Sequence, residues 1–371
     1  MQAATNPLEA TARIPARRWI DFLPGILLTG AIALLANELS KTAWMQAHGF
    51  SALTLAIVIG MIAGNTFYPR IAAVGACGVA FSKQTLLRLG IILYGLRLTF
   101  QDIGRVGVIG VMVDAIVLST TFALSWWAGT RLFGLNRRTA MLIGAGSSIC
   151  GAAAVMATEP VVRGRAEEVS IAVATVVAFG TLAIFIYPAL YHLNDRMHWV
   201  SITPFAYGIF TGSTVHEVAQ VVAAGKAVAE STANTAVITK LVRVMMLAPF
   251  LVLLSAYLSR NSEQGAALTT TTHPHSWRRV IPWFALGFIA VAGFNSLALL
   301  PRAVVSTAID ADTLILATAM AALGVSTQVA AIRQAGVKPL ALAALLFGWL
   351  IFGGFAINTG ITALFGKLFG H

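Results

Sequence analysis

The segment PLALAALLFGWLIFGGFAINTGITALF, at residues 339–365, contains no charged side chain. A helix needs about 20 mostly apolar residues to cross the hydrocarbon core of a bilayer, so this segment is long enough to do so. The whole chain of 371 residues has the same character, with 58% hydrophobic and 11% charged residues. A soluble domain has about 45–50% apolar and about 25% charged residues. We therefore predict an all-α integral membrane protein and exclude a disordered chain or an ordinary cytosolic enzyme.

Ten further apolar runs precede this segment, so we expect about eleven transmembrane helices. The eleven predicted spans are 22–39, 51–69, 84–102, 106–128, 139–157, 169–190, 203–225, 235–258, 281–300, 312–332 and 339–365. The stretch RIAAVGACGVAFS (70–82) is apolar but too short to cross, and we expect it to be an interfacial or re-entrant piece.

The distribution of basic residues predicts the orientation, because cytoplasmic loops are enriched in Lys and Arg. With the N-terminus inside, the cytoplasmic segments carry Arg13, Arg17, Arg18, Arg70, Lys83, Arg131, Arg137, Arg138, Arg196, Arg260, Arg278, Arg279, Arg333 and Lys338. The outer segments carry fewer, namely Lys41, Arg105, Arg163, Arg165, Lys226, Arg302 and Lys367. We expect a multi-pass protein of a bacterial inner membrane with a cytoplasmic N-terminus and a periplasmic C-terminus.

The net charge of +11 would suggest a nucleic-acid partner in a soluble protein. Here we assign it to one membrane face and expect no nucleic acid. The two cysteines, Cys77 and Cys150, give no disulfide framework or metal cluster. A nucleotide-binding motif of the form GxxxxGK[ST] does not occur in the sequence. We expect no cofactor, no metal and no enzymatic activity.

Three pairs of short motifs suggest an internal repeat. They are GMIAGNT (60–66) with GIFTGST (208–214), LLRLGIIL (86–93) with LVRVMMLA (241–248), and GSSICGAA (146–153) with GVSTQVAA (324–331). Each pair lies five predicted spans apart, so the partners would run in opposite directions. We therefore predict an inverted 5+5 repeat, which is typical of secondary transporters.

The repeat gives the expected domains. Residues 1–50 form an N-terminal cytoplasmic segment and an extra transmembrane helix, 51–200 the first repeat, and 201–371 the inverted second repeat, which contains a polar cytoplasmic loop at 259–280. A competing alignment pairs GSSICGAAAVMA (146–157) with GSTVHEVAQVVA (212–223). It joins two spans that would run in the same direction, so we prefer the 5+5 pairing.

Glycines and hydroxyl residues in the centres of these spans predict interrupted helices. Backbone that leaves the helix at this depth must meet water, ligand or protein, and half-helix N-termini favour an anion. Small residues in membrane helices also simply permit close packing, which is the favoured role of Gly60/Gly64 and Gly208/Gly212. The candidate substrate-binding residues are Gly146, Ser147, Ser148, Cys150, Gly324, Ser326, Thr327, Gln328, Asn65, Ser213 and Thr214.

Charged residues inside spans are functional candidates because they are costly there. Glu217 would carry a coupling proton, shared with His216, or form a structural ion pair. Asp114 is open to the same two interpretations. The basic residues Arg88, Lys240 and Arg243 would either line an anion path or extend towards the membrane surface. The coupling or ion-pair candidates are therefore His216, Glu217, Arg88, Lys240, Arg243 and Asp114.

Four motifs resemble the YeiH family of bacterial inner-membrane proteins, also called UPF0324, whose suggested activity is sulphate export. They are FSKQTLLRLGIILYGLRLTFQDI (81–103), GSSICGAAAVMA (146–157), STVHEVAQVVAAG (213–225) and TKLVRVMMLAPFL (239–251). The resemblance runs from about residue 20 to the end. It implies a fold like the bile-acid/sodium symporters, with interrupted crossing helices. This chain lacks the Asp pair of those sodium-coupled relatives, which argues against antiport by a dyad.

We expect a secondary transporter for a small anion, namely sulphate or a related sulphur oxyanion or sulphonate. An anion channel-like conduit or a non-transporting membrane sensor is the alternative. The expected partners are membrane lipid, the anionic substrate and a coupling proton or sodium ion, and a second copy of the chain in a homodimer is one option.

Overall fold

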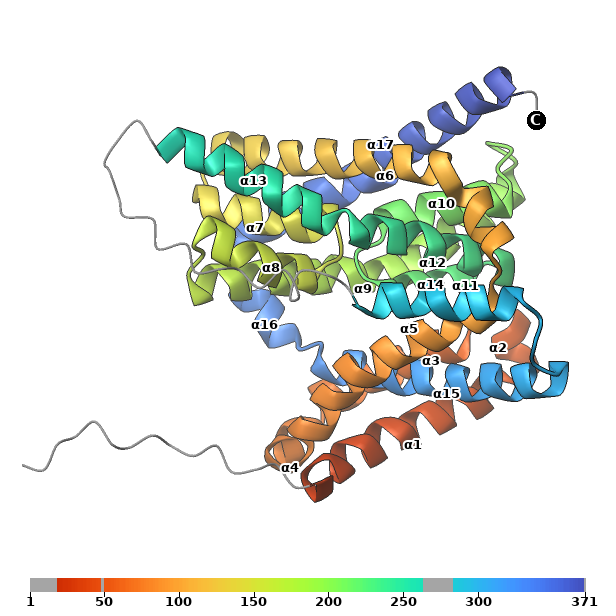
Figure 1. Cartoon of the computed structure of the whole chain (residues 1–371). Helices are drawn as coiled ribbons and strands as arrows, with labels where there is room; N and C mark the ends of the chain where they lie inside the picture. The colour runs from red at the N-terminus through yellow and green to blue at the C-terminus, as the bar shows by residue number, and fades with distance from the viewer. Residues whose placement is uncertain (1–18, 48–49, 263–282, 370–371) are drawn as a thin grey trace, which may run out of the picture.

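The computed structural model describes residues 19–47, 50–262 and 283–369 (Figure 1). Helices build the fold, and these ranges contain no strand. The α-helices are α1 (Leu23–Ser40), α2 (Ala43–Ala47), α3 (Ala52–Asn65), α4 (Tyr68–Phe81), α5 (Leu87–Tyr94), α6 (Phe100–Trp127), α7 (Arg137–Ser148), α8 (Ala152–Val162), α9 (Ala166–Met197), α10 (Pro204–Thr214), α11 (Val218–Lys226), α12 (Glu230–Met245), α13 (Leu247–Ser262), α14 (Trp283–Ser296), α15 (Arg302–Ser326), α16 (Val329–Gln334) and α17 (Val337–Phe369). Tighter or wider turns form η1 (Trp19–Phe22), η2 (Ser82–Leu86), η3 (Gly95–Arg97) and η4 (Ala128–Leu132). The predicted all-α class is confirmed.

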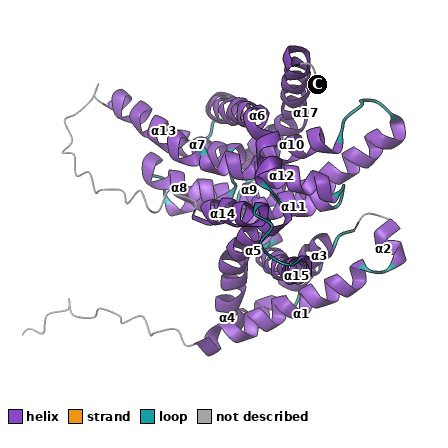
Figure 2. Ribbon diagram, turned by 45° about the vertical axis from the view of Figure 1, so that its right-hand side comes forward, coloured by secondary structure: helices purple, strands orange, loops and turns teal. Residues whose placement is uncertain are grey.

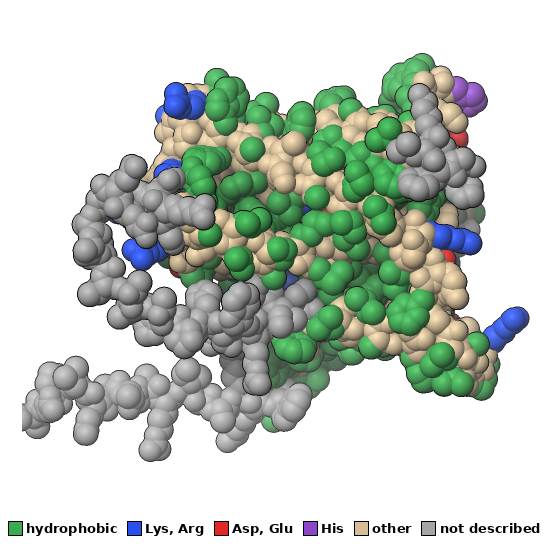
Figure 3. Space-filling view, turned by 45° about the horizontal axis from the view of Figure 1, so that its top comes forward, with side chains coloured by type: hydrophobic (Ala, Val, Ile, Leu, Met, Phe, Trp, Pro, Cys, Tyr) green, Lys and Arg blue, Asp and Glu red, His purple; other side chains and the backbone are tan. Residues whose placement is uncertain are grey.

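Seven helical segments are long and apolar enough to cross a membrane. They are Ile20–Ser40, Tyr68–Arg97, Phe100–Leu132, Ala166–Met197, Glu230–Leu258, Arg302–Ser326 and Val337–Phe365. The apolar helices α3 and α14 are shorter. Hydrophobic side chains cover the middle of the face in Figure 3, and Lys and Arg side chains lie towards its ends. The multi-pass membrane prediction is confirmed, but eleven spans are not.

The stretch 70–82 is not an interfacial or re-entrant piece. It forms most of α4, which continues through η2 and α5 as one helical segment from Tyr68 to Arg97. The predicted span at 84–102 is thus the second half of a longer crossing. The loop predicted at 259–280 starts later than expected, because α13 extends to Ser262. Most of that loop lies outside the described residues.

Predicted span 139–157 is instead a hairpin of two antiparallel helices, α7 and α8. Asn136, before α7, donates a hydrogen bond to Glu168 at the start of α9, with 2.9 Å between Nδ2 and Oε1. The chain therefore returns after α8 to the end where α7 began. The turn uses Gly151 at φ 72°, a conformation that glycine adopts at little cost. At 12 residues, α7 is about 18 Å long, too short to cross a bilayer.

Predicted span 203–225 is a second hairpin, formed by α10 and α11. Thr232 at the start of α12 donates to the carbonyl of Pro204 at the start of α10 (3.2 Å), so these two starts are neighbours. At the far end of α11, Ala227 O lies 3.2 Å from His192 Nε2 near the end of α9. The 32-residue α9 separates the two hairpins, which therefore enter from opposite ends of the molecule (Figure 1).

The hairpins change the interpretation of the repeat. The parity argument for a 5+5 repeat requires 139–157 and 203–225 to cross the membrane, and neither segment does so. The structure makes α7–α8–α9 similar to α10–α11–α12, a hairpin followed by a long helix in each case. This matches the competing alignment of 146–157 with 212–223. The domain division at 51–200 and 201–371 stays a prediction.

The helices form two groups (Figures 1 and 2). The first group contains α1, α3, α4 and α15, and the second, which we call the hairpin group, contains α6 to α13 and α17. Between them lie α5 and α14. Glycines let α3 and α15 pack backbone to backbone, because a Cβ at Gly60 would come within 2.3 Å of Ala321 O, and one at Gly324 within 2.3 Å of Ile57 O. The first group is therefore held by close helix packing.

Candidate functional site

The tips of the two hairpins meet at Lys240 of α12. Its ammonium group donates to the carbonyl of Ile149 in the first tip and to that of Val215 in the second, each at 2.6 Å. The Lys240 side chain is completely buried. One buried cation therefore binds backbone from hairpins that enter from opposite ends.

Arg243, one helical turn further along α12, makes the same kind of contact. Its guanidinium donates to the carbonyls of Ser148 (2.6 Å) and Ser147 (3.5 Å) in the first hairpin. It also donates to the carbonyl of Ser213 in the second hairpin. The last carbonyls of a helix lack partners within the helix and carry partial negative charge. Lys240 and Arg243 thus satisfy the C-terminal ends of both α7 and α10.

Two acidic residues face this cluster. Asp114 of α6 is completely buried, and neither carboxylate oxygen has a hydrogen-bond partner among the described residues. Arg243 and Lys240 are the basic groups that act on it electrostatically. Glu217, in the second tip, is partly exposed and interacts electrostatically with Lys83 and Lys240. The two cations therefore have two nearby counter-charges, as buried charges in a membrane protein require.

Glu217 connects the two tips. Its own N–H donates to Gln220 Oε1 (3.0 Å), which caps the start of α11. Its carboxylate accepts from the backbone N–H of Ala152 at the start of α8. Beside it, the ring of His216 is 2% exposed and its Nδ1 has no partner within the described ranges. The structure thus brings both predicted titratable residues of the second hairpin to the tips.

The predicted hydroxyl groups at the tips bond to their own helices. Ser148 Oγ donates to Ala145 O (3.4 Å), and both Ser213 Oγ (3.1 Å) and Thr214 Oγ1 (2.5 Å) donate to Phe210 O. The backbone carbonyls of Ser148 and Ser213, rather than their hydroxyls, accept hydrogen bonds from Arg243. Gly146 packs closely against Val155 and Val176, and Cys150 is buried at the turn.

Another set of predicted binding residues lies apart from the tips, where α15 ends and α16 begins. Asn65 donates to Thr327 O (2.9 Å) and accepts from the N–H of Val329 (3.0 Å), so it bridges this interruption. Ser326 and Thr327 bond to Leu323 O of their own helix. Among the described residues, no hydrogen bond joins this cluster to the hairpin tips.

The remaining predicted site residues lie outside the hairpin tips. Gln328 is exposed between α15 and α16, and Gly324 packs against α3. Arg88, the predicted repeat counterpart of Arg243, is exposed, whereas Arg243 is fully buried. The interruptions that face each other are thus those at 149–151 and 215–217, and not the predicted pair of spans 5 and 10.

An ion-pair network at the end where α10 enters was not predicted as a site. Arg97 lies within 3.3 Å of both Asp312 of α15 and Glu230 of α12. Tyr94 donates to Asn234 Oδ1 of α12 (2.9 Å). These bonds link α5 and α15 to the hairpin group. The signal was present in the sequence, because Asp312 and Arg97 are charges at the edges of apolar segments.

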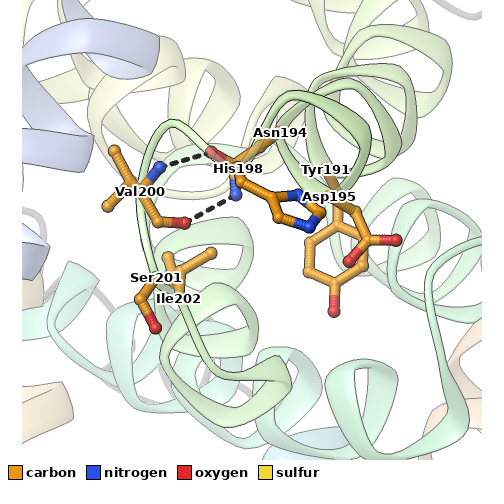
Figure 4. A pocket seen from close by; sticks show the side chains of 7 residues that line it. All are labelled: Tyr191, Asn194, Asp195, His198, Val200, Ser201 and Ile202. Atoms are coloured by element: carbon orange, nitrogen blue, oxygen red, sulfur yellow. Dashed lines mark hydrogen bonds between the residues drawn. The ribbon is translucent and has the colours of Figure 1, made fainter.

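A pocket of about 300 Å³ lies at the end of α9 (Figure 4). Its lining residues are Tyr191, Asn194, Asp195, His198, Val200, Ser201 and Ile202. Reciprocal hydrogen bonds between Asn194 and Val200 (2.8 and 3.0 Å) close the loop around it. None of the predicted site residues lines this pocket.

Known proteins match nearly the whole chain, including both hairpins. A family model described as "Conserved hypothetical protein 698" matches residues 24–343, which include both hairpins and α12. The UPF0324 inner membrane protein YeiH of Escherichia coli (strain K12) is 53% identical over 341 residues, 91% of this chain and 93% of the relative. The chain belongs to the UPF0324 family. The resemblance to YeiH seen in the four sequence motifs is therefore confirmed.

Two other UPF0324 relatives are at least as similar. A UPF0324 membrane protein of Pseudomonas aeruginosa is 58% identical over 350 residues, 94% of this chain and 97% of the relative. The UPF0324 inner membrane protein YeiH of Salmonella typhimurium is 53% identical over 356 residues, 96% and 99% of the two chains. The names of these relatives give a membrane location and state no substrate. This chain is thus a membrane protein of the UPF0324 family.

Proposed function

We propose that this UPF0324 protein is a secondary transporter that moves a small anion across the bacterial inner membrane by alternating access. The observation that carries the proposal is the meeting of two oppositely entering hairpins at the buried Lys240 and Arg243. Transporter sites typically lie where helices are interrupted near the middle of the membrane. We propose that the protein carries its substrate across the membrane and does not convert it chemically.

The charge of the cluster supports an anionic substrate. Lys83, Lys240 and Arg243 bring three positive charges to the tips, against two carboxylates at Asp114 and Glu217. A basic excess inside a low-dielectric region attracts anions. Sulphate, a related sulphur oxyanion or a sulphonate is the proposed substrate class, with a proton or sodium ion as the coupling ion.

The two helix groups provide the parts that would move. The bonds from Arg97 to Glu230 and from Tyr94 to Asn234 join them at the end where α10 enters. Alternating access requires such contacts to form on one side and break on the other. We propose that this network is a gate, which is closed in the present structure.

The hairpins change the side of the membrane to which three basic residues belong. Because α7 and α8 return to the same end, Arg163 and Arg165 lie on the side of Arg137, while Arg196 at the end of α9 lies on the opposite side. The described basic residues at the α7 entry end are Arg70, Arg131, Arg137, Arg138, Arg163, Arg165, Arg333 and Lys338. The other end has fewer, namely Lys41, Arg105, Arg196, Lys226 and Arg302. We propose that the α7 entry end is cytoplasmic, as is the N-terminus, and that the gate is periplasmic.

Flux in proteoliposomes tests the proposal. The purified protein would be reconstituted, and the uptake of radiolabelled sulphate, sulphite and a sulphonate would be measured for wild type, Arg243→Gln and Glu217→Gln. A carrier gives saturable uptake that depends on an ion gradient, whereas a channel-like conduit gives uptake that does not saturate in the same range. Absence of flux with sulphate, sulphite and sulphonates would favour a non-transporting sensor. Flux equal to wild type in both variants would disprove the site.

A further inference from the structure

The carboxylate of Glu217 lies at the N-terminus of α8, the second helix of the other hairpin. Ala152 N–H donates to it, and Gly151 leaves room for it, because a Cβ at Gly151 would come within 2.6 Å of Glu217 Cγ. The first amides of an 11-residue helix are unpaired and carry partial positive charge. A negative group therefore already occupies a place that suits an anion.

Groups from several elements surround this carboxylate. Lys83 of η2 and Lys240 of α12 act on it with positive charge. Cys150 of the first tip is close enough to interact with it electrostatically, and His216 precedes it in the chain. The buried Nδ1 of His216 has no partner within the described ranges, so the tip holds a polar atom that the protein itself does not satisfy.

We propose that Glu217 and the transported anion compete for the N-terminus of α8. This inference rests on the proposed function and gives it a coupling step. When Glu217 is ionised, its carboxylate occupies the amides and excludes the anion. When Glu217 takes up a proton, its negative charge is lost and the anion replaces it at Ala152. One proton and one anion then bind together, and both leave together.

The position of Glu217 between the starts of α8 and α11 supports this role. Glu217 is the N-cap residue of α11, and its own N–H donates to Gln220 Oε1 (3.0 Å). At α8 the cap is a carboxylate from another segment, and it is partly exposed between the two helix groups.

Binding of sulphate at different pH tests the competition without transport. Sulphate remains a dianion between about pH 6 and pH 8, so the apparent dissociation constant of wild type should rise about tenfold per pH unit where Glu217 is ionised. Glu217→Gln keeps a hydrogen-bond acceptor but no charge, and its affinity should not depend on pH. Glu167→Gln, at an exposed position of α9, is the matched control and should behave as wild type.

Flux measurements on the same variants test the coupling. Glu217→Gln should still exchange labelled for unlabelled sulphate but lose at least about tenfold in accumulation driven by a pH gradient, because its binding no longer depends on the proton. Glu217→Ala should gain thermal stability from sulphate, relative to chloride at equal ionic strength, by more than wild type does. Correct folding would be checked by size-exclusion chromatography.

The outcomes separate the two proposals. The same pH dependence in wild type and Glu217→Gln, or unchanged pH-driven accumulation in that variant, overturns the competition and leaves the transporter proposal intact. Absence of sulphate, sulphite and methanesulphonate binding in wild type and in Glu217→Ala overturns both. A pH-independent Glu217→Gln beside a pH-dependent wild type supports the inference.

Discussion

Asn136 and Glu168 are hydrogen-bonded at 2.9 Å, although 31 residues of chain lie between them. The bond joins the start of α7 to the start of α9, and it shows that the chain between them enters the molecule and returns. The first hairpin, and with it the place of Ser148 and Cys150 opposite the second tip, follows from this return.

Labelling of single cysteines tests the hairpin topology. In a variant with Cys77 and Cys150 replaced by Ala, cysteines at Gly134 and Gly164 should react with an impermeant reagent from the same side of the membrane. A cysteine at Ser201 should react from the other side, because α9 crosses between them. Opposite sidedness of Gly134 and Gly164 would restore the single span at 139–157.

Replacement of Lys240 by Met should strongly destabilise the protein. It leaves the carbonyls of Ile149 and Val215 without their partner, and each buried unsatisfied carbonyl costs about 1–3 kcal/mol. Thermal unfolding in detergent measures the effect, with Arg88→Met as the control because Arg88 is exposed. Equal Tm values for the two variants would mean that Lys240 does not hold the tips.

Removal of the Glu230 charge should open the proposed gate. Glu230→Gln weakens the contacts of that residue with Arg97 and Lys226. Since Glu230 is about half exposed, its ion pairs contribute little, and we expect the labelling rate of a cysteine at Thr313 to rise by up to about fivefold. The control is Glu38→Gln, which breaks the exposed pair with Lys41. An unchanged rate would argue against a gate at this place.

Alanine at Gly60 should destabilise the α3–α15 packing. The new Cβ would lie 2.3 Å from Ala321 O, a backbone atom that moves only with its helix. Overpacking of this kind costs about 1–3 kcal/mol. Gly30→Ala is the matched control, because no atom lies within 4 Å of a Cβ there. We expect a lower Tm for Gly60→Ala and an unchanged or higher Tm for Gly30→Ala.

The sequence predicted the long crossings well because a span is a local property. The runs at 22–39, 106–128, 169–190 and 339–365 each correspond to a segment that is long and apolar enough to cross. The predicted single spans at 139–157 and 203–225 were wrong. An apolar run of that length has the same composition whether it crosses the membrane once or turns back as a hairpin. The prediction for 70–82 was wrong because the polar residues at Ser82–Leu86 interrupt the apolar run. The helix nevertheless continues through them.

The candidate site was predicted in part. Glycines and polar groups in GSSICG and GSTVHE marked both tips, because such residues are unusual in the middle of apolar segments. The Asn65 and Thr327 cluster was added by the repeat argument, and the structure places it at the end of α15. Arg97, Asp312 and Glu230 were missed as a group because they are distant in the chain and meet only after folding.

The sequence by itself determined that the protein is an all-α membrane protein with a few charges buried among apolar helices, since hydropathy is set by neighbouring residues. Only the tertiary structure decided that two segments turn back and that Lys240 and Arg243 bind both tips. The physical reason is that carbonyls at a helix end require a partner but do not specify which one. That partner comes from α12, more than 90 residues after the first tip, and only the packing of the helices brings it there.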